Sequence, residues 1–218
     1  MIEVPSHTLA AQYLRPVITV VDTCSFWEGE PPVVCGVLGL LRRPDLRLLE
    51  IGTYRGCSLV QFRAMFPASR LESLNVPPEQ AKAGETEILP REQIGGCARA
   101  MGVDYVQHFG DSRYFDFSSL GQFDAVFIDG NHHEDFVLSD SMRTLEVLRG
   151  GGVMIWHDCT DRYHLGRCVL RAIGRLPFAG RIVAVRGTTL CYFLKPVGPV
   201  KARGRFRAAS RNLWRTAG

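Results

Sequence analysis

An apolar strand that ends in an acid and runs into a glycine turn is the feature that most constrains how this chain can fold. Residues 48–51 read Leu-Leu-Glu-Ile, residues 52–56 read Gly-Thr-Tyr-Arg-Gly, and a helical pattern then runs to Phe66. The N-terminus of a helix presents unpaired N–H groups, and glycine lets a ligand come close to the backbone. The acid at the strand end, Glu50, can accept hydrogen bonds from a cationic or hydroxylated ligand. The run therefore predicts a ligand-binding strand–turn–helix unit.

Polar residues also follow three later apolar runs. These are Gly110-Asp111-Ser112, Phe127-Ile128-Asp129-Gly130, and the segment from Gly150 to Asp158, which contains Trp156-His157-Asp158. Open α/β sheets bind ligands outside the carboxyl ends of their strands. We therefore expect these polar groups to gather at one edge of a sheet.

The order of predicted elements indicates an α/β fold. Strands are expected at 47–51, 71–75, 103–109, 123–129, 152–156, 181–185 and 190–194, with helices at 56–66, 138–148 and 165–176. Leu138, Met142, Leu145 and Leu148 form the apolar stripe of the second helix, which the glycine triplet at 150–152 is expected to end. The short turn at 187–188 makes the last two strands a hairpin. The pattern predicts a doubly wound, mostly parallel seven-stranded sheet with an antiparallel last strand.

The chain of 218 residues is long enough for one domain with a real core. We expect a helical cap over residues 1–45, a ligand-binding domain over 46–195 and a basic tail over 196–218. Seven basic and no acidic residues follow residue 194. Such a tail either contacts nucleic acid, an anionic surface or a partner subunit, or is a solvated end. Residues 77–96 are polar and rich in Pro, Gly and Glu, which is typical of a functional lid.

Several classes of protein are disfavoured. No apolar run approaches the ~20 residues that span a bilayer, and the N-terminal residues lack the pattern of a secretory signal. The seven cysteines are odd in number and contain no Cys-x-x-Cys pair, which suits reduced thiols. We therefore expect a cytoplasmic protein with no membrane span. The Gly-x-Gly-x-x-Gly pattern of NAD-dependent dehydrogenases is absent.

The motifs resemble class I S-adenosylmethionine (SAM)-dependent methyltransferases with a Rossmann-like fold. Glu-Ile-Gly-Thr-Tyr-Arg-Gly at 50–56, Ile-Asp-Gly-x-His at 128–132 and Gly-Gly-Val-x-Ile-Trp-His-Asp at 151–158 look like the small-molecule O-methyltransferase branch. That branch includes metal-dependent sugar methyltransferases of the macrocin type. The resemblance covers roughly residues 45–195. It departs from the usual Glu-x-Gly-x-Gly-x-Gly at Tyr54, which replaces the middle glycine.

The resemblance implies a set of cofactor contacts. Glu50 and Gly52 stand where the family contacts the methionine end of SAM, and Asp111 with Ser112 stands where it reads the adenine. Asn75 replaces the acid that grips the ribose hydroxyls, and an amide binds a diol more weakly than a carboxylate. Glu72 and Glu79 are possible substitutes for that acid. The predicted cofactor-binding residues are Glu50, Gly52, Thr53, Tyr54, Gly56, Ser58, Asn75, Asp111, Ser112 and Asp129.

Asp129 and Asp158 end neighbouring predicted strands, which lie ~5 Å apart, so their carboxylates can share one cation. Mg²⁺ prefers oxygen ligands and would lower the pKa of an acceptor hydroxyl. His132 is the candidate catalytic base. In the macrocin-type enzymes the corresponding positions are metal carboxylates and a base histidine, but the residue before the second aspartate is an acid there and His157 here. His157 is kept as a candidate ligand, although imidazole suits Mg²⁺ poorly. Either a third carboxylate is missing, or the metal resembles Mn²⁺, or there is no metal.

The sequence thus predicts a SAM-dependent O-methyltransferase that acts on a hydroxyl of a small polar acceptor. A sugar or oligosaccharide, as in the assembly of methylated mannosides or polysaccharides, is the preferred acceptor by resemblance, and a homodimer is expected. One alternative is a nucleic-acid methyltransferase steered by the basic tail, although the Asn-Pro-Pro-Tyr-like loop of amino-group methylation is missing. The other is a non-catalytic SAM-binding interaction protein, which requires Asp129 and His132 to be dispensable.

Overall fold

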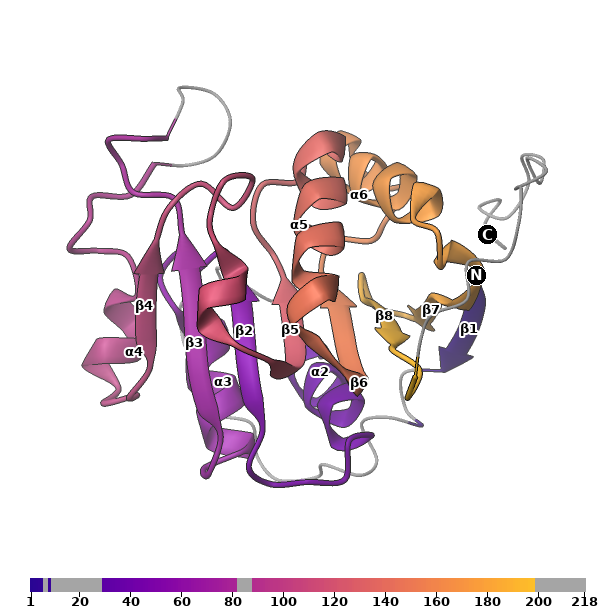
Figure 1. Cartoon of the computed structure of the whole chain (residues 1–218), viewed down its shortest axis with the longest axis horizontal. Coiled ribbons are helices and arrows are strands. Elements are labelled where there is room, and N and C mark those ends of the chain that lie inside the picture. The colour runs from indigo at the N-terminus through magenta and orange to yellow at the C-terminus, as the bar shows by residue number, and fades with distance from the viewer. Residues whose placement is uncertain (6–7, 9–28, 82–87, 199–218) are drawn as a thin grey trace.

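The computed structural model describes residues 1–5, 8, 29–81 and 88–198. Within these residues eight strands form one sheet in the order β1-β7-β8-β6-β5-β2-β3-β4 (Figure 1). The strands are β1 (Ile2–Pro5), β2 (Arg47–Ile51), β3 (Arg70–Asn75), β4 (Val106–Phe109), β5 (Phe123–Ile128), β6 (Leu148–Trp156), β7 (Val183–Arg186) and β8 (Cys191–Leu194). The helices are α2 (Glu30–Gly39), α3 (Cys57–Met65), α4 (Gly96–Ala100), α5 (Glu134–Val147) and α6 (His164–Arg175), with 3₁₀ turns η1 (Phe117–Leu120) and η2 (Ala179–Arg181).

The sheet is parallel except at β8, which runs antiparallel to both of its neighbours, β6 and β7. Central strand β5 is buried along its whole length. Its apolar sequence explains this position, because helices cover both faces of a parallel sheet. The predicted α/β fold, mostly parallel with an antiparallel last strand, is confirmed.

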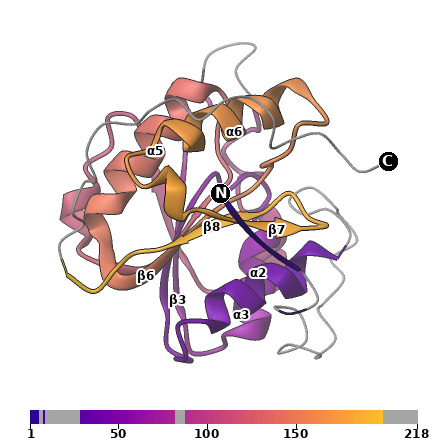
Figure 2. The ribbon, with the colours of Figure 1, turned by 90° about the vertical axis from the view of Figure 1, so that its right-hand side faces the viewer.

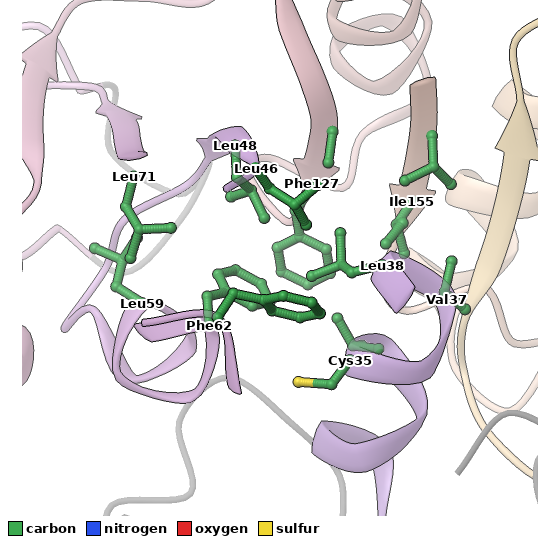
Figure 3. Close-up of a cluster of buried hydrophobic side chains, with 14 of the residues drawn as sticks. Cys35, Val37, Leu38, Leu46, Leu48, Leu59, Phe62, Leu71, Phe127 and Ile155 are labelled. Carbon is green, nitrogen blue, oxygen red and sulfur yellow. The ribbon is translucent and has the colours of Figure 1, made fainter. Parts of the chain in front are cut away.

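Helices cover the sheet on both faces, with α2 and α3 on one side and α5 and α6 on the other (Figure 2). Successive side chains of a strand point to opposite faces. In β2, Leu48 accordingly packs in the cluster with α2 and α3, and Leu49 packs in the cluster with α5 and α6. On the first face, Phe62 of α3 meets Phe127 of β5 edge to face, with ring centroids 5.5 Å apart (Figure 3). The two helical layers therefore pack against opposite faces of the sheet and hold the strand ends in fixed positions.

The N-terminal residues differ from the sequence prediction, which made 1–45 helical throughout. Residues 2–5 form an eighth strand, β1, which pairs in parallel with β7. A four-residue strand that gains its partner from residue 183 onward has too little local pattern to be recognised. Helix α2 is present as expected, and residues 6–7 and 9–28 of the predicted cap lie outside the described residues.

The glycine triplet also behaves differently from the prediction. Helix α5 ends at Val147, and Gly150 to Gly152 lie within β6 instead of closing the helix. Gly151 has a φ of 84°, and its N–H donates to the carbonyl of Lys195 over 2.8 Å. The triplet thus bends the start of β6 beside Lys195, the residue that follows β8.

The buried face of α5 matches the predicted stripe only in part, because Leu138 and Leu145 pack against the apolar core but Met142 does not. Met142 is 41% exposed, whereas Asp140, Ser141 and Thr144 are buried. The Ser141 hydroxyl accepts a hydrogen bond of 2.9 Å from the indole N–H of Trp156. Ser141 therefore has a partner in the sheet, whereas the hydroxyl of Thr144 donates to the carbonyl of Asp140 within α5 over 2.6 Å.

Three other predicted segments need adjustment. Strand β4 begins at Val106 rather than at residue 103. Residues 82–87 of the predicted lid and 199–218 of the predicted tail lie outside the described residues. No helix in the described part of the chain is long and apolar enough to cross a membrane.

Candidate active site

The glycine turn between β2 and α3 has an unusual backbone. Gly52, Tyr54 and Gly56 all have positive φ, at 98°, 44° and 79°. A Cβ atom at Gly52 would lie 2.2 Å from the carbonyl oxygen of Asp129, so any side chain there would clash with the tip of β5. Gly56 caps α3 without a side-chain hydrogen bond. The N-terminal N–H groups of α3 therefore have no side-chain cap, which suits a ligand over the turn.

Glu50 lies beneath this turn with no exposed surface. Its carboxyl group accepts hydrogen bonds from the hydroxyls of Ser58 and, over 2.7 Å, Ser73. Burial raises the pKa of Glu50 to about 8, because no cation lies close enough among its hydrogen-bond partners to offset the loss of water. The predicted methionine-end acid is thus protonated at neutral pH in this structure.

Three predicted cofactor residues mainly support the turn. The hydroxyls of Thr53 and Ser73 are 2.7 Å apart, and Gln107 donates to Thr53 over 2.9 Å. Ser58 and Thr53 are both buried. The Ser58 hydroxyl donates to Glu50 directly, and the Thr53 hydroxyl meets Ser73, which donates to Glu50. The side-chain oxygen of Asn75 accepts the backbone N–H of Tyr54 over 3.1 Å. Gln107 was not predicted, since a glutamine in a strand carries no distinctive sequence signal.

The possible ribose-binding acids are engaged elsewhere. Glu72 is buried inside β3, where it pairs with Arg47 at 2.7 Å and His108 at 3.0 Å. Glu79 is exposed and pairs with Arg91, which also lies over the ring of Phe109 at 4.3 Å from its centroid. Glu72 is therefore an ion-pair partner within the sheet. Asn75 remains the residue at the position where the family has the acid that binds the ribose.

The predicted adenine-reading residues follow β4. Asp111 is held by Arg113, whose guanidinium lies 2.7 Å from the carboxylate and 3.8 Å from the ring centroid of Phe136. Asp140 of α5 is nearly inaccessible to solvent, and burial raises its pKa to about 7 against a hydrogen bond with Ser112. Asp140 was missed because it is not one of the apolar residues that defined the predicted stripe of the helix.

A second cluster of ionisable side chains lies at the tips of β5 and β6. Asp129, His132 and Asp158 each offer one ligand atom, and these atoms all lie within 4.8 Å of one another. His132 Nε2 is 2.7 Å from an Asp158 oxygen and 3.6 Å from an Asp129 oxygen. The structure therefore brings together the three residues that the sequence placed at two neighbouring tips.

Asp158 is held in a strained conformation. Its φ of 56° lies in the left-handed region, which is uncommon for a residue with a side chain. The hydroxyl of Tyr163 donates to its carboxylate, and the next residue, Cys159, donates its N–H to Thr189 over 2.7 Å. These contacts hold the Asp158 carboxylate toward His132. Tyr163 was not predicted, because the loop before α6 has no motif.

His157 occupies the position that was considered for a third metal ligand, but both of its ring nitrogens have carboxylate partners. Nδ1 lies 3.2 Å from Asp129, and Nε2 lies 2.9 Å from Glu30 of α2. The side chains of His157 and Glu30 are 5% and 1% exposed. The structure thus disfavours ligation by His157, because binding a metal would break a buried ion pair. Glu30 was missed because its partner is 127 residues away.

Charges dominate this second cluster. Burial alone would raise the pKa of Asp129 and Asp158, but His157 and His132 lower both, that of Asp158 strongly. Burial opposes the charge on His132, yet hydrogen bonds and charges of the two aspartates raise its pKa to about 9. The same balance, with Asp129 as the main cause, holds the pKa of His157 well above its usual value. All four groups are thus ionised at neutral pH when no other cation is present.

The donor set fits a hard divalent cation. Two carboxylates from adjacent strands supply oxygen ligands, and Mg²⁺ commonly uses one or two carboxylates and completes its shell with water or substrate oxygens. The imidazole of His132 lies close enough to both carboxylates to act on a ligand beside them.

Comparisons with solved structures show where this fold has been seen. The O-methyltransferase TomG from Streptomyces achromogenes, solved with SAM, is 21% identical over 74% of this chain and 78% of its own, with a TM-score of 0.51. The O-methyltransferase from Bacillus cereus, solved with S-adenosylhomocysteine (SAH), is 15% identical over 87% of this chain and 88% of its own, with a TM-score of 0.53.

A third structure is larger than this chain. The MycE methyltransferase from the mycinamycin pathway, solved with Mg, SAH and mycinamycin VI, is 19% identical over 89% of this chain and 55% of its own, with a TM-score of 0.52. These likenesses show the fold. A search of curated proteins finds no match. The model of the methyltransferase domain family matches residues 49–159, half of the chain, from the glycine turn to the tip of β6. The chain therefore belongs to the methyltransferase domain family.

Proposed function

We propose that this protein transfers a methyl group from SAM to a hydroxyl of a small polar acceptor. The observation that carries the proposal is the cluster of Asp129, His132 and Asp158, which lies at the strand tips beside the glycine turn. The family match supports methyl transfer, and the fold is the one found in TomG and the Bacillus cereus enzyme, whose structures hold SAM or SAH.

SAM would lie over the turn, with its methionine end near Gly52 and above Glu50. Its ribose would reach Asn75 at the end of β3, and its adenine would reach Asp111 and Ser112 after β4. Thr53 and Ser58 would act indirectly, because their hydroxyls hold the Glu50 network. The backbone of Tyr54 and Gly56 shapes the turn.

Asp129 and Asp158 would hold Mg²⁺ or a similar cation. When bound, such a cation lowers the pKa of a coordinated hydroxyl and offsets the charge of its carboxylate ligands. MycE, solved with Mg, supports this part of the proposal. His157 is not part of the ligand set, since Glu30 and Asp129 occupy its ring.

His132 would accept the proton of the acceptor hydroxyl. In the absence of another cation its pKa of about 9 keeps it protonated at neutral pH. It acts as a base only when the negative charge of Asp129 and Asp158 is offset. His133 has a different place, because it is the N-cap residue directly before α5 and its backbone N–H donates to the Asn131 side chain over 2.9 Å. The methyl transfer itself is an in-line displacement, so positioning is the main task of the protein.

The preferred acceptor is a sugar or oligosaccharide, because adjacent hydroxyls can bridge two carboxylates and an imidazole.

The wider arrangement of the chain is also part of the proposal. It comprises a cap over residues 1–45, a catalytic domain over 46–195, a basic tail over 196–218, a homodimer and a cytoplasmic location. The described cysteines are free thiols: Cys35, Cys57, Cys97, Cys159, Cys168 and Cys191.

Calorimetry with SAM and SAH tests the cofactor, and tritiated SAM tests transfer to a panel of saccharides, phenols, nucleosides and RNA. We expect binding of both cofactor forms and label on a hydroxyl compound. Asp129→Ala should bind SAH yet transfer no label. Absence of SAM and SAH binding to the unmutated protein would refute the proposal, and label on RNA alone would favour a nucleic-acid methyltransferase.

A further inference from the structure

A buried acid on the N-terminal helix reaches the candidate active site. Glu30 begins α2, directly after Gly29, and two prolines fix the first turn of the helix. Its side chain is 1% exposed. A carboxylate is rarely so deeply buried unless it is paired, so its partners indicate its purpose.

Both oxygens of Glu30 are engaged by residues close to the site. One lies 2.9 Å from Nε2 of His157, and the other accepts the backbone N–H of Thr189 over 2.5 Å. Thr189 belongs to the turn between β7 and β8, and its carbonyl in turn accepts the N–H of Cys159. Glu30 therefore joins α2, the β7–β8 turn and the tip of β6 at one point.

His157 transmits this contact to Asp129. Its backbone N–H donates to the carbonyl of Ile128 over 3.1 Å, which fixes the main chain beside β5. The ring is held at its other end by Glu30, which lies 2.9 Å from Nε2. With Nε2 held there, Nδ1 lies 3.2 Å from Asp129 and 3.5 Å from Asp158.

We infer that Glu30 is a positioning residue, which fixes the ring of His157 so that Asp129 and Asp158 keep their oxygens on the acceptor side. The inference rests on the proposed function, in which these two aspartates hold the cation. It makes α2 part of the active site, although α2 lies outside the segment that matches the family model. Partners behind metal ligands typically change metal affinity by 10–100-fold when removed.

The test compares Glu30→Ala and Glu30→Gln with Val37→Ala. Val37 lies on the same helix and is fully buried, but it packs in the apolar cluster and so controls for loss of helix packing. Binding of Mn²⁺ alone is measured by electron paramagnetic resonance, binding of SAH by calorimetry, and the ring nitrogens of His157 by ¹⁵N NMR.

We expect Glu30→Ala to weaken Mn²⁺ binding by about 10–100-fold and to shift the His157 Nδ1 resonance. SAH affinity should change less than threefold. Glu30→Gln should recover only part of the Mn²⁺ affinity, since its single amide oxygen can accept from Nε2 or from the N–H of Thr189 but not from both. Val37→Ala should bind Mn²⁺ normally.

Equal Mn²⁺ affinity in folded Glu30→Ala and the unmutated protein would overturn the inference, as would an equal loss in Val37→Ala. If the unmutated protein binds SAH but no Mn²⁺, the metal part of the proposed function fails. The Nδ1 resonance then decides the role of Glu30 by itself, because an unchanged resonance in Glu30→Ala overturns the inference and a shifted one supports it.

Discussion

Two groups of acids lie at the same edge of the sheet, and at neutral pH one is protonated whereas the other is ionised. Glu50, beneath the glycine turn, is surrounded by hydroxyls, and burial raises its pKa to about 8. Asp129 and Asp158, at the next two strand tips, contact imidazoles that lower their pKa. Burial acts in the same direction on all three, so the neighbours decide the outcome.

The comparison separates two ways of preparing a site. On the turn side, Glu50 is protonated, and a cationic ligand can displace its proton. On the acid–imidazole side, Asp129 and Asp158 are ionised and paired with imidazolium groups, which another cation can replace. In the proposed reaction the first side meets the ammonium group of SAM and the second meets the acceptor. The predictions below test whether each side behaves in this way.

The largest expected effect is on the acid–imidazole side. Chelation of divalent cations with EDTA should abolish methyl transfer, and added Mg²⁺ should restore it, because His132 stays protonated while the two aspartates keep their charge. The measurement is transfer of tritium from labelled SAM, with SAH affinity in EDTA as the control for an intact fold. An undiminished rate in EDTA would leave Asp129 and Asp158 as contacts of cofactor or substrate only.

Replacement of the proposed base comes next. His132→Ala should lower kcat by about 10²–10⁴-fold, the usual contribution of general-base catalysis, and leave SAH affinity nearly unchanged. His133→Ala is the matched control, since His133 is the next residue but serves as the N-cap of α5. Steady-state rates with the acceptor found in the panel measure the effect. If His133→Ala lost activity and His132→Ala kept it, the assignment of the base would be wrong.

On the turn side, SAH affinity should depend on pH through Glu50. Below pH 8 the free protein holds a proton on Glu50, and the ammonium group of SAH favours the ionised form, so binding releases that proton. Affinity should therefore rise by up to about tenfold per pH unit toward pH 8 and then level off. Calorimetry in buffers of different ionisation enthalpy measures the proton released. Glu50→Gln should remove the pH dependence, and a slope that persists in this variant would contradict the prediction.

The smallest effect is on stability and concerns Asp140. Its folded pKa of about 7 exceeds the unfolded value of 3.8, so the folded state keeps a proton that the unfolded state loses between these two pH values. The free energy of unfolding should fall with rising pH across this window by up to about 1.4 kcal/mol per unit, and then level off. Asp140→Asn should remove this contribution and be the more stable form above pH 7.

Urea unfolding at pH 5 and pH 8 measures the difference. Asp135→Asn is the matched control, because Asp135 is an exposed residue of the same helix. An equal pH slope in Asp140→Asn and the unmutated protein would show that Asp140 is ionised in the folded state.

Local sequence pattern was sufficient for most of the fold. The apolar runs at β2 and β5, with polar residues directly after them, placed the glycine turn and Asp129 correctly. Where the pattern failed, distant partners decide the structure. Residues 2–5 are a strand because β7 lies beside them, and Gly151 and Gly152 extend β6 because their backbone bonds to Lys195, the residue after β8.

The same distinction holds for the candidate site. Asp129, His132 and Asp158 could be placed together because parallel strands end at one edge of the sheet. Glu30 reads locally as an ordinary acid in the first turn of a helix. Asp140 reads as a surface residue between apolar positions. Their roles depend on contacts with His157 and Ser112 that only the folded chain creates.

The clash that any side chain at position 52 would make with the carbonyl of Asp129 limits how this protein can be redesigned or can evolve. Asp129 also donates its N–H to the carbonyl of Ile51 over 2.9 Å. The turn that is proposed to bind SAM and the strand tip that is proposed to bind the acceptor are therefore joined through their backbones. Changes of acceptor selectivity that move the tip of β5 would disturb the methyl donor as well. Libraries aimed at new acceptors should instead vary exposed positions of the loop before α6, such as Arg162, whose backbone N–H donates to the Thr160 hydroxyl in that same loop.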